Sequence, residues 1–307
     1  MKEIESNNQI TIAIGLGKSC IAASKYLSSN GEKVLIFENS SNESLKKIAA
    51  ELINLGINVQ LGTPLEFSSF KPWIATLSSV VIGPGIPWNH DTLNKLRVEG
   101  IEIKSEISIA WESLKGIPWV GVTGTNGKTT VTNMLHHVLQ NSPIDSYIGG
   151  NIGRAATELS LAFKDSSTIK NKWLIIELSS YQIESAPEIA PQIGIWTTLT
   201  PDHLERHGSI NNYFKIKRSL LKKSSLRIYN ADDKYLNAHR NQLPKGIWVS
   251  IKGPGSKADT NKFWITSKGQ VIEEGTELFN AKVLSIPGAH NLQNLLLVTA
   301  AAREIGL

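Results

Sequence analysis

The residues best suited to chemistry lie in a glycine-rich segment, TGTNGKTT, at positions 123–130. It follows an apolar, β-branched run and precedes an amphipathic helical pattern, which is the context that a phosphate-binding loop requires. Backbone N–H groups at the helix N-terminus would hold phosphate oxygens, Lys128 would neutralise the β- and γ-phosphates, and the Thr129 hydroxyl would bind Mg²⁺. We therefore expect ATP as a ligand, with these contacts: Gly124, Thr125, Asn126, Gly127, Lys128, Thr129 and Thr130.

The spacing of this loop departs from G-x-x-x-x-G-K-[ST], because position 122 is valine and the nearest preceding glycine is Gly124. The loop is therefore interpreted as a shortened variant. A plain glycine turn with a solvated lysine is the alternative.

A second glycine loop, GLGKSC at 15–20, resembles G-x-G-x-x-G with Cys20 in place of the last glycine. Glu38 closes the next predicted strand, where an acid could accept hydrogen bonds from a ribose. The residues alone leave open a nicotinamide dinucleotide site, as in a dehydrogenase, or a tight turn beside a solvated acid. Cys20 is expected to be a small buried residue that faces the sheet.

Three further segments carry polar residues. Glu177 ends an apolar strand, at the sheet edge where a carboxylate suits Mg²⁺, although a helix-capping acid would look similar. His203 and His207 raise a zinc alternative, which no H-E-x-x-H pattern supports. Asn291 and Asn294 share one face at the start of the last helix, where they could present amides to a ligand or cap the helix.

Strand and helix patterns alternate along the whole chain, which predicts α/β architecture with parallel sheets. Strands are expected at 10–14, 34–37, 57–61, 78–82, 101–104, 117–123, 173–178, 193–199, 226–231 and 246–251. Two helices show one apolar stripe each, Leu45, Ile48, Ala49, Leu52 and Ile53 in the first and Val131, Met134, Leu135, Val138 and Leu139 in the second. Gly306 is expected to end the last helix.

Composition excludes several classes of protein. The 307 residues are 41% hydrophobic and 19% charged, which rules out a disordered chain and suggests two domains. A net charge of +5 without a basic block gives little support to nucleic-acid binding. One cysteine excludes a disulfide framework, and no apolar stretch suits a membrane span or a signal peptide, so a cytoplasmic protein is expected.

Six motifs in order resemble the Mur ligases, the ATP-dependent amide-forming enzymes of peptidoglycan precursor synthesis: TGTNGKTT, GGNIG (149–153), ELSSYQIE (177–184), TPDHLERHG (200–208), NADD (230–233) and GAHNLQN (288–294). The phosphate loop is shared with folylpolyglutamate synthetases. ELSSYQIE, with GGNIG and the first glycine loop, is similar to the D-glutamate-adding branch of the family. The resemblance implies a Rossmann-like UDP-binding domain at 1–116, a P-loop ATPase-type central domain at 117–307, and an absent C-terminal ligase domain.

The resemblance also implies the reaction. The carboxylate of UDP-N-acetylmuramoyl-L-alanine would attack the ATP γ-phosphate and form an acyl phosphate, which the amine of D-glutamate then opens. Lys128, Glu177, His203 and Lys217 would be catalytic, and two Mg²⁺ ions would be bound through Thr129, Glu177, His203 and Lys217, with Lys217 carbamylated. Asn291 and Asn294 would contact ATP.

For the muramoyl substrate, the resemblance implies two sets of contacts. The UDP group would be held by Gly15, Gly17, Lys18, Ser19, Glu38, Asn39 and Gly85, and the muramoyl-alanine region by Asn151, Ser179 and Asp202. A monomer without nucleic-acid or membrane partners is expected. Two alternatives remain open at this point: a non-catalytic module that binds the UDP-sugar peptide and ATP, because without the third domain the chain is expected to be inactive or severely impaired, and a related Mur or folylpolyglutamate-type ligase.

Overall fold

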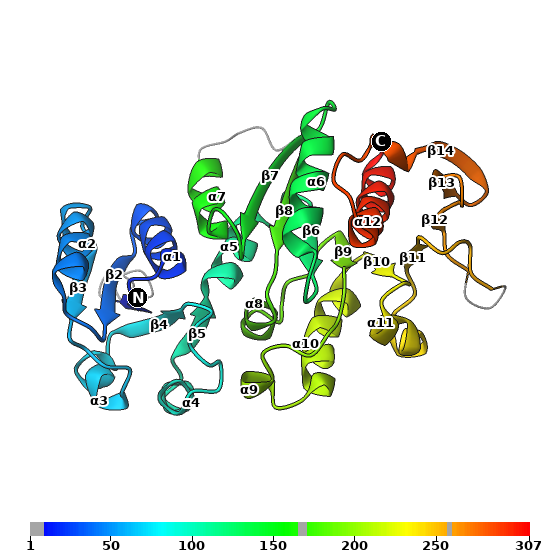
Figure 1. Ribbon diagram of the computed structural model, residues 1–307. Coiled ribbons are helices and arrows are strands. Elements are labelled where there is room, and N and C mark those ends of the chain that lie inside the picture. Colours follow the sequence, from blue (N-terminus) through cyan, green and yellow to red (C-terminus); the bar gives the residue numbers. More distant parts are fainter. Residues whose placement is uncertain (1–8, 165–170, 257–259) are drawn as a thin grey trace. The chain divides into compact units, whose positions relative to one another are not determined.

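The computed structural model describes residues 9–164, 171–256 and 260–307, which form two compact units. The first unit contains the described residues of 9–114, 154–164 and 184–186, and the second contains those of 115–153, 171–183 and 187–307. Each unit has its own sheet with helices packed on it, so the expected α/β class is confirmed (Figure 1).

Five parallel strands form the sheet of the first unit, in the order β3-β2-β1-β4-β5. They are β1 (Ile10–Ile14), β2 (Lys33–Glu38), β3 (Asn58–Leu61), β4 (Leu77–Ile82) and β5 (Glu102–Ser105). The helical segments are α1 (Lys18–Ser29), α2 (Glu43–Asn54), α3 (Phe67–Phe70), η2 (Lys71–Trp73), α4 (Asp91–Val98), α5 (Glu106–Leu114) and α7 (Ala156–Phe163). The strand order reverses between β1 and β4, and open α/β sheets bind ligands at such a point.

Both faces of this first sheet are buried. Ile12 and Ile14 belong to a core cluster on one face, whereas Ala13 belongs to a second cluster on the other. Strands covered on both sides need apolar residues at every position, which explains their unbroken hydrophobic runs. On α2, Ala49 and Leu52 of the expected apolar stripe are buried. Ile53 was wrongly included in that stripe, because it is 51% exposed.

Helix α7 follows β7 in the sequence but packs on α1 and α5 in the first unit. The Glu106 carboxylate, at the start of α5, accepts hydrogen bonds from the backbone N–H (2.6 Å) and the hydroxyl (2.9 Å) of Thr157 in the first turn of α7. A carboxylate at this position satisfies helix donors that have no partner within the helix. Burial raises the pKa of Glu106 to about 7, because its anionic form loses water.

Nine strands form the sheet of the second unit, in the order β14-β13-β12-β11-β10-β9-β6-β8-β7. They are β6 (Trp119–Thr123), β7 (Asp145–Gly150), β8 (Lys172–Glu177), β9 (Ile193–Trp196), β10 (Leu226–Asn230), β11 (Ile247–Ser250), β12 (Phe263–Ile265), β13 (Gln270–Glu273) and β14 (Thr276–Asn280). The strands from β7 to β12 are parallel, and β13 and β14 pair antiparallel at the edge, so this sheet is mixed.

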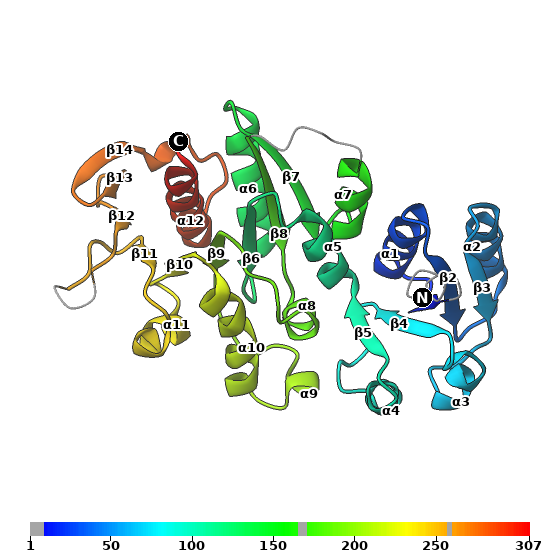
Figure 2. The ribbon, with the colours of Figure 1, turned by 180° about the vertical axis from the view of Figure 1, so that it is seen from behind.

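The helical segments of the second sequence half are α6 (Lys128–Gln140), α8 (Ser180–Ser185), α9 (Leu204–His207), α10 (Ile210–Lys223), α11 (Lys234–Ala238), η3 (Arg240–Gln242), η4 (Ala281–Val283) and α12 (Ala289–Ile305). Helices α6 and α12 lie side by side in both ribbon views (Figures 1 and 2) and share one core cluster with the strands. Val138 leaves the stripe expected on α6, at 38% exposed. Gly306 ends α12 with a φ of +112°, as expected.

Candidate active site

A pocket of about 620 Å³ lies at the strand-order reversal of the first unit, beyond the carboxyl ends of β1 and β4. It is lined by all seven residues expected to hold UDP: Gly15, Gly17, Lys18, Ser19, Glu38, Asn39 and Gly85. The glycine loop after β1, the end of β2 and the GPGIP loop after β4 therefore surround one cavity.

Glu38 holds two segments of this pocket in place. Its carboxylate accepts hydrogen bonds from the backbone N–H of Leu16 and of Ser40, both at 2.9 Å. The acid therefore braces the glycine loop, a role that the sequence pattern does not show. Cys20 is 2% exposed, its thiol donates to the Ile14 carbonyl, and burial raises its pKa to about 12, so its interpretation as a buried small residue is confirmed.

The phosphate loop of the second unit joins β6 to α6, and two of its glycines are required by geometry. Gly127 caps α6 at a φ of +85°, and a Cβ there would lie 2.9 Å from the Asn294 Oδ1 atom. At Gly124, with a φ of +150°, a Cβ would overlap the Thr197 side chain. The loop is also tied to the segment after β9, because the Asn126 N–H donates to the Thr198 hydroxyl at 2.9 Å.

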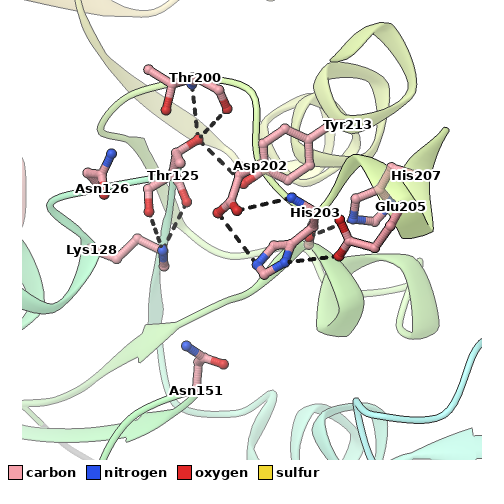
Figure 3. A network of polar contacts seen from close by, with 12 residues as sticks. Thr125, Asn126, Lys128, Asn151, Thr200, Asp202, His203, Glu205, His207 and Tyr213 are labelled. Atoms are coloured by element: carbon pink, nitrogen blue, oxygen red, sulfur yellow. Dashed lines mark hydrogen bonds and ion pairs between the residues drawn. The ribbon is translucent and has the colours of Figure 1, made fainter. Parts of the chain in front are cut away.

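Lys128 curls back onto its own loop (Figure 3). Its Nζ atom donates to the carbonyl oxygens of Gly124, at 3.0 Å, and Thr125, at 2.8 Å. Burial lowers the pKa of Lys128, while Glu177 and Asp202 raise it. These contacts fold the ammonium group against the loop whose N–H groups would receive phosphates.

Glu177 brings together three of the expected site residues. One of its carboxylate oxygens accepts from the Thr129 hydroxyl and the other from the Asn151 amide, both at 2.8 Å. The side chain is 1% exposed. A hydroxyl and a carboxylate in contact at the end of a parallel strand are the oxygen ligands that Mg²⁺ prefers beside phosphates. The donor set therefore fits a magnesium ion.

Lys217 reaches the same loop from α10. It is 1% exposed, and its Nζ atom donates to the Gly124 carbonyl at 3.0 Å and the Thr123 hydroxyl at 3.2 Å. Burial, and then the Lys128 charge, lower the pKa of Lys217 to about 7. The Tyr213 ring lies 4.7 Å from this Nζ atom. A lysine with this pKa has a substantial neutral fraction near pH 7.

His203 lies apart from these contacts, in the exposed segment before α9. Its ring nitrogens face Asp202, at 3.5 Å, and Glu205, at 3.8 Å (Figure 3). Within the described ranges, no three His, Cys, Asp or Glu side chains gather as a metal site would require. Nor do the two histidines form a zinc pair, because the His207 Nε2 atom contacts the Ser180 hydroxyl at 2.9 Å.

Three more of the expected site residues are Asn291 and Asn294 in α12 and Ser179, which precedes α8. Asn294 lies against Gly127, whereas the Asn291 amide, in the first turn of α12, donates to the carbonyl of Pro287, just before that helix, at 2.7 Å. Ser179 donates to the Gln182 side chain through its N–H, at 3.0 Å, and its hydroxyl, at 3.1 Å. Only Asn294 of these three touches the phosphate loop in the contacts described.

A second pocket, of about 520 Å³, lies beside the phosphate loop at the carboxyl ends of β9 and β10. Thr198, Thr200, Asn230 and Gln293 line it; the last three lie in the motifs TPDHLERHG, NADD and GAHNLQN, but the sequence assigned no role to any of the four. Thr198 and Thr200 bond to the loop residues Asn126 and Thr125, and Asn230 donates to the Gln293 side chain at 3.3 Å. For Thr198, the sequence signal was the TLTP run at 198–201. This run follows β9, which pairs with β6, the strand that leads into the phosphate loop.

No described helix is long and apolar enough to cross a membrane.

The fold and the loop contacts define an α/β nucleotide-binding protein, and a family model specifies its class. Residues 122–302 match the Mur ligase middle domain, so the chain belongs to the Mur ligase family. The expected resemblance is confirmed.

Relatives of known name extend this match over the whole chain. It is 62% identical over 307 residues to a UDP-N-acetylmuramoylalanine--D-glutamate ligase of Prochlorococcus marinus, in an alignment that covers 100% of this chain and 65% of that protein. It is 54% identical to the enzyme of the same name from a Synechococcus species, with 97% of this chain and 65% of that protein covered. The chain thus spans about two thirds of the length of these relatives.

Solved structures support the fold. The UDP-N-acetylmuramate:L-alanyl-gamma-D-glutamyl-meso-diaminopimelate ligase from Neisseria meningitides aligns with a TM-score of 0.64 at 18% identity, covering 97% of this chain and 94% of that chain. A murein peptide ligase from Psychrobacter arcticus aligns with a TM-score of 0.61 at 19% identity, covering 97% and 66%.

Proposed function

We propose that this chain carries the UDP-sugar site and the ATP site of a ligase that joins D-glutamate to UDP-N-acetylmuramoyl-L-alanine in peptidoglycan precursor synthesis. The observation that carries the proposal is the contact set of the phosphate loop: Thr129 bonded to buried Glu177, with Lys128 and Lys217 both on the Gly124 carbonyl. The names of the relatives supply the substrates.

In the proposed site the loop N–H groups and Lys128 bind the β- and γ-phosphates of ATP. The pocket beside the loop, lined by Asn230 and Gln293, has room for the nucleoside, and Asn294 of α12 lies against Gly127, the residue before α6. Contacts from Asn291 stay part of the proposal. ATP and the substrate carboxylate are both anionic. The reaction therefore needs cations and backbone N–H groups that point at the phosphates.

Thr129 and Glu177 would hold one Mg²⁺, and His203 with a carbamylated Lys217 a second. A bound Mg²⁺ supplies charge neutralisation at the phosphates. Carbamylation would convert the Lys217 amine into an anionic oxygen ligand. Only the neutral amine reacts with CO₂, and the lowered pKa of Lys217 makes this form available near pH 7.

The proposed chemistry has two steps. An oxygen of the alanyl carboxylate attacks the γ-phosphorus, the bond to the β-phosphate oxygen breaks, and ADP leaves. The amine of D-glutamate then attacks the acyl carbon, loses a proton and expels inorganic phosphate. The chain would position the phosphate through its loop, beside the buried Glu177 and Lys217.

The first unit would bind the UDP end of the substrate in its 620 Å³ pocket, through the backbone of the loop after β1. We assign UDP binding to 1–116 and ATP binding to 117–307. Asn151, Ser179 and Asp202 would contact the muramoyl-alanine region. We further propose that the protein is a cytoplasmic monomer.

Isothermal titration with UDP-N-acetylmuramoyl-L-alanine, followed by a non-hydrolysable ATP analogue with Mg²⁺, tests this proposal. Saturable binding of both ligands is expected. With ATP itself, phosphate release that depends on D-glutamate distinguishes a ligase from the alternative, a module that binds the UDP-sugar peptide and ATP without adding D-glutamate. Absence of UDP-sugar binding together with NADH binding would overturn the assignment.

A further inference from the structure

His207 is a buried histidine for which the proposed reaction has no role. It ends α9 and is 6% exposed. Its Nε2 atom lies 2.9 Å from the Ser180 hydroxyl, and its ring stacks on the Tyr213 ring, with centroids 5.3 Å apart and planes at 28°. The histidine is therefore fixed both by a hydrogen bond at its edge and by a ring at its face.

Tyr213 connects this histidine to the phosphate loop. Its hydroxyl lies 3.4 Å from the Thr125 hydroxyl, and its ring lies 4.7 Å from the Lys217 ammonium. A rotation of the Tyr213 ring would thus change the packing of a loop residue and of a lysine that bonds to the loop. In the close-up, Tyr213 lies between Thr125 and His207 (Figure 3).

On its other side His207 contacts the segment that carries Glu177. Ser180 starts α8, three residues after Glu177. The next residue, Tyr181, has its ring 5.4 Å from His207 and 5.1 Å from His203. His207 is therefore in contact with the start of α8, which follows β8, and with α10, the helix that carries Lys217.

We infer that His207 is a positioning residue for the ATP site: it holds Tyr213 against Thr125 and Lys217 by stacking on its ring while Ser180 fixes the histidine edge. The inference rests on the proposed function. A histidine suits this position because it is planar enough to stack and also carries a ring nitrogen for the serine. Phenylalanine could supply only the first contact, and glutamine only the second.

The test measures Kd for a non-hydrolysable ATP analogue with Mg²⁺ in the 307-residue chain and in variants. His207→Phe and Ser180→Ala each remove the same hydrogen bond, and each should weaken binding about threefold to tenfold. The double variant should bind no more weakly than the weaker single variant, because one interaction has been removed twice. His207→Ala, which also removes the stacking on Tyr213, should bind the ATP analogue most weakly of all the variants.

Two controls separate positioning from folding. UDP should bind all variants as it binds the wild type, because the pocket assigned to UDP lies in the first unit. His137→Ala, at an exposed histidine of α6, should leave the ATP-analogue Kd unchanged. Ser180→Ala changes the buried volume very little, so this variant still tests the inference if His207→Ala fails to fold.

Wild-type Kd for the ATP analogue in folded His207→Ala would overturn the inference and leave the proposed function standing. Additive losses in the Ser180→Ala and His207→Phe pair would also overturn it, since the two side chains would then act separately. A wild-type chain that binds the UDP-sugar peptide but no ATP analogue would overturn the proposed ATP site and this inference together.

Discussion

Two lysines from different elements, Lys128 of α6 and Lys217 of α10, donate to one acceptor, the carbonyl oxygen of Gly124. Their charges repel each other, and both pKa values are lowered, with burial as the main cause. Such an arrangement costs stability in the free chain and favours a ligand that brings negative charge. We expect Lys128 to contribute directly to ATP binding and Lys217 to react with CO₂, and each expectation can be tested by substitution.

Lys128→Ala should weaken binding of the ATP analogue with Mg²⁺ by at least about tenfold, because a charge-assisted contact to phosphate is lost. Titration calorimetry measures the change. UDP-N-acetylmuramoyl-L-alanine should still bind with its wild-type affinity, and Lys223→Ala, at an exposed lysine of α10, is the matched control. Loss of both ligands in Lys128→Ala would show that the division of the two sites is wrong.

Lys217 should take up CO₂ as the pH rises. The pKa lies near 7, below the ordinary 10.5, so the neutral amine that reacts with CO₂ predominates above pH 7 and disappears as the pH falls through that value. We expect a carbamate signal in ¹³C NMR with labelled bicarbonate at about pH 8, and its loss near pH 6. Lys217→Ala should abolish the signal and Lys222→Ala should retain it. A signal that persists in Lys217→Ala would exclude this lysine.

Residue types that carry chemistry were readable from the sequence, but their partners were not. The glycine, lysine and threonine of the loop have a fixed spacing that reflects the phosphate they would bind. By contrast, the bond from Glu38 to the Leu16 N–H and the approach of Asn294 to Gly127 depend on how separate elements pack. No local pattern encodes such contacts.

At the scale of elements, the turn into α6 depends on a left-handed glycine. Gly127→Ala should destabilise the chain by about 1 kcal/mol through its positive φ, and should also displace Asn294 and weaken binding of the ATP analogue. Gly31→Ala is a matched control, since its φ of +86° is nearly the same and nothing lies near its Cβ. Equal ATP-analogue affinity in the two variants would contradict a role for this close approach.

The contact between α5 and α7 predicts a pH-dependent stability. The folded pKa of Glu106 is raised to about 7 from 4.5, so its contribution is fully present below pH 4.5 and is lost as the pH rises through 7. Glu106→Gln keeps the acceptor for Thr157 without the charge. Between about pH 5 and pH 8 the wild type should therefore lose about 2 kcal/mol of unfolding free energy relative to the Glu106→Gln variant.

Urea denaturation at the two pH values measures this difference, with Glu99→Gln, at an exposed acid beyond α4, as the control. A constant difference between Glu106→Gln and the wild type across this range would mean that Glu106 stays ionised in the folded chain.

Elements with strong apolar patterns were predicted, and those with weak patterns were missed. The central strands β1, β4, β6, β8, β9 and β10 are buried and β-branched, so their runs stand out. The strands β7, β12, β13 and β14 escaped detection because they lie at or near an edge of the sheet, and because β12 has only three residues and the others carry several polar or glycine residues. Helix α7 could not be assigned to the first unit from sequence, because its packing partners lie far along the chain.

At the scale of the whole molecule, each of the two sheets carries a glycine loop at the carboxyl end of an interior strand, β1 in the first and β6 in the second. In the first, the loop after β1 lines a pocket near β4, and in the second, the loop after β6 is bonded to the segment after β9. Both positions follow the rule for ligand sites in open α/β sheets. The two loops differ in chemistry, since only the second brings a buried carboxylate and a buried lysine to its phosphate side.

This difference predicts that the two ligands stabilise different parts of the chain. UDP-N-acetylmuramoyl-L-alanine should slow hydrogen exchange in β1, β2 and α1, and the ATP analogue with Mg²⁺ in β6 and α6. At about one hundred times Kd each ligand should add roughly 2.7 kcal/mol of protection to amides that exchange by unfolding of its own unit. Lys128→Ala should remove only the second pattern, and NADH should produce neither. If one ligand protected both sheets equally, the two units would unfold together, and separate binding sites could then be inferred only from the titrations.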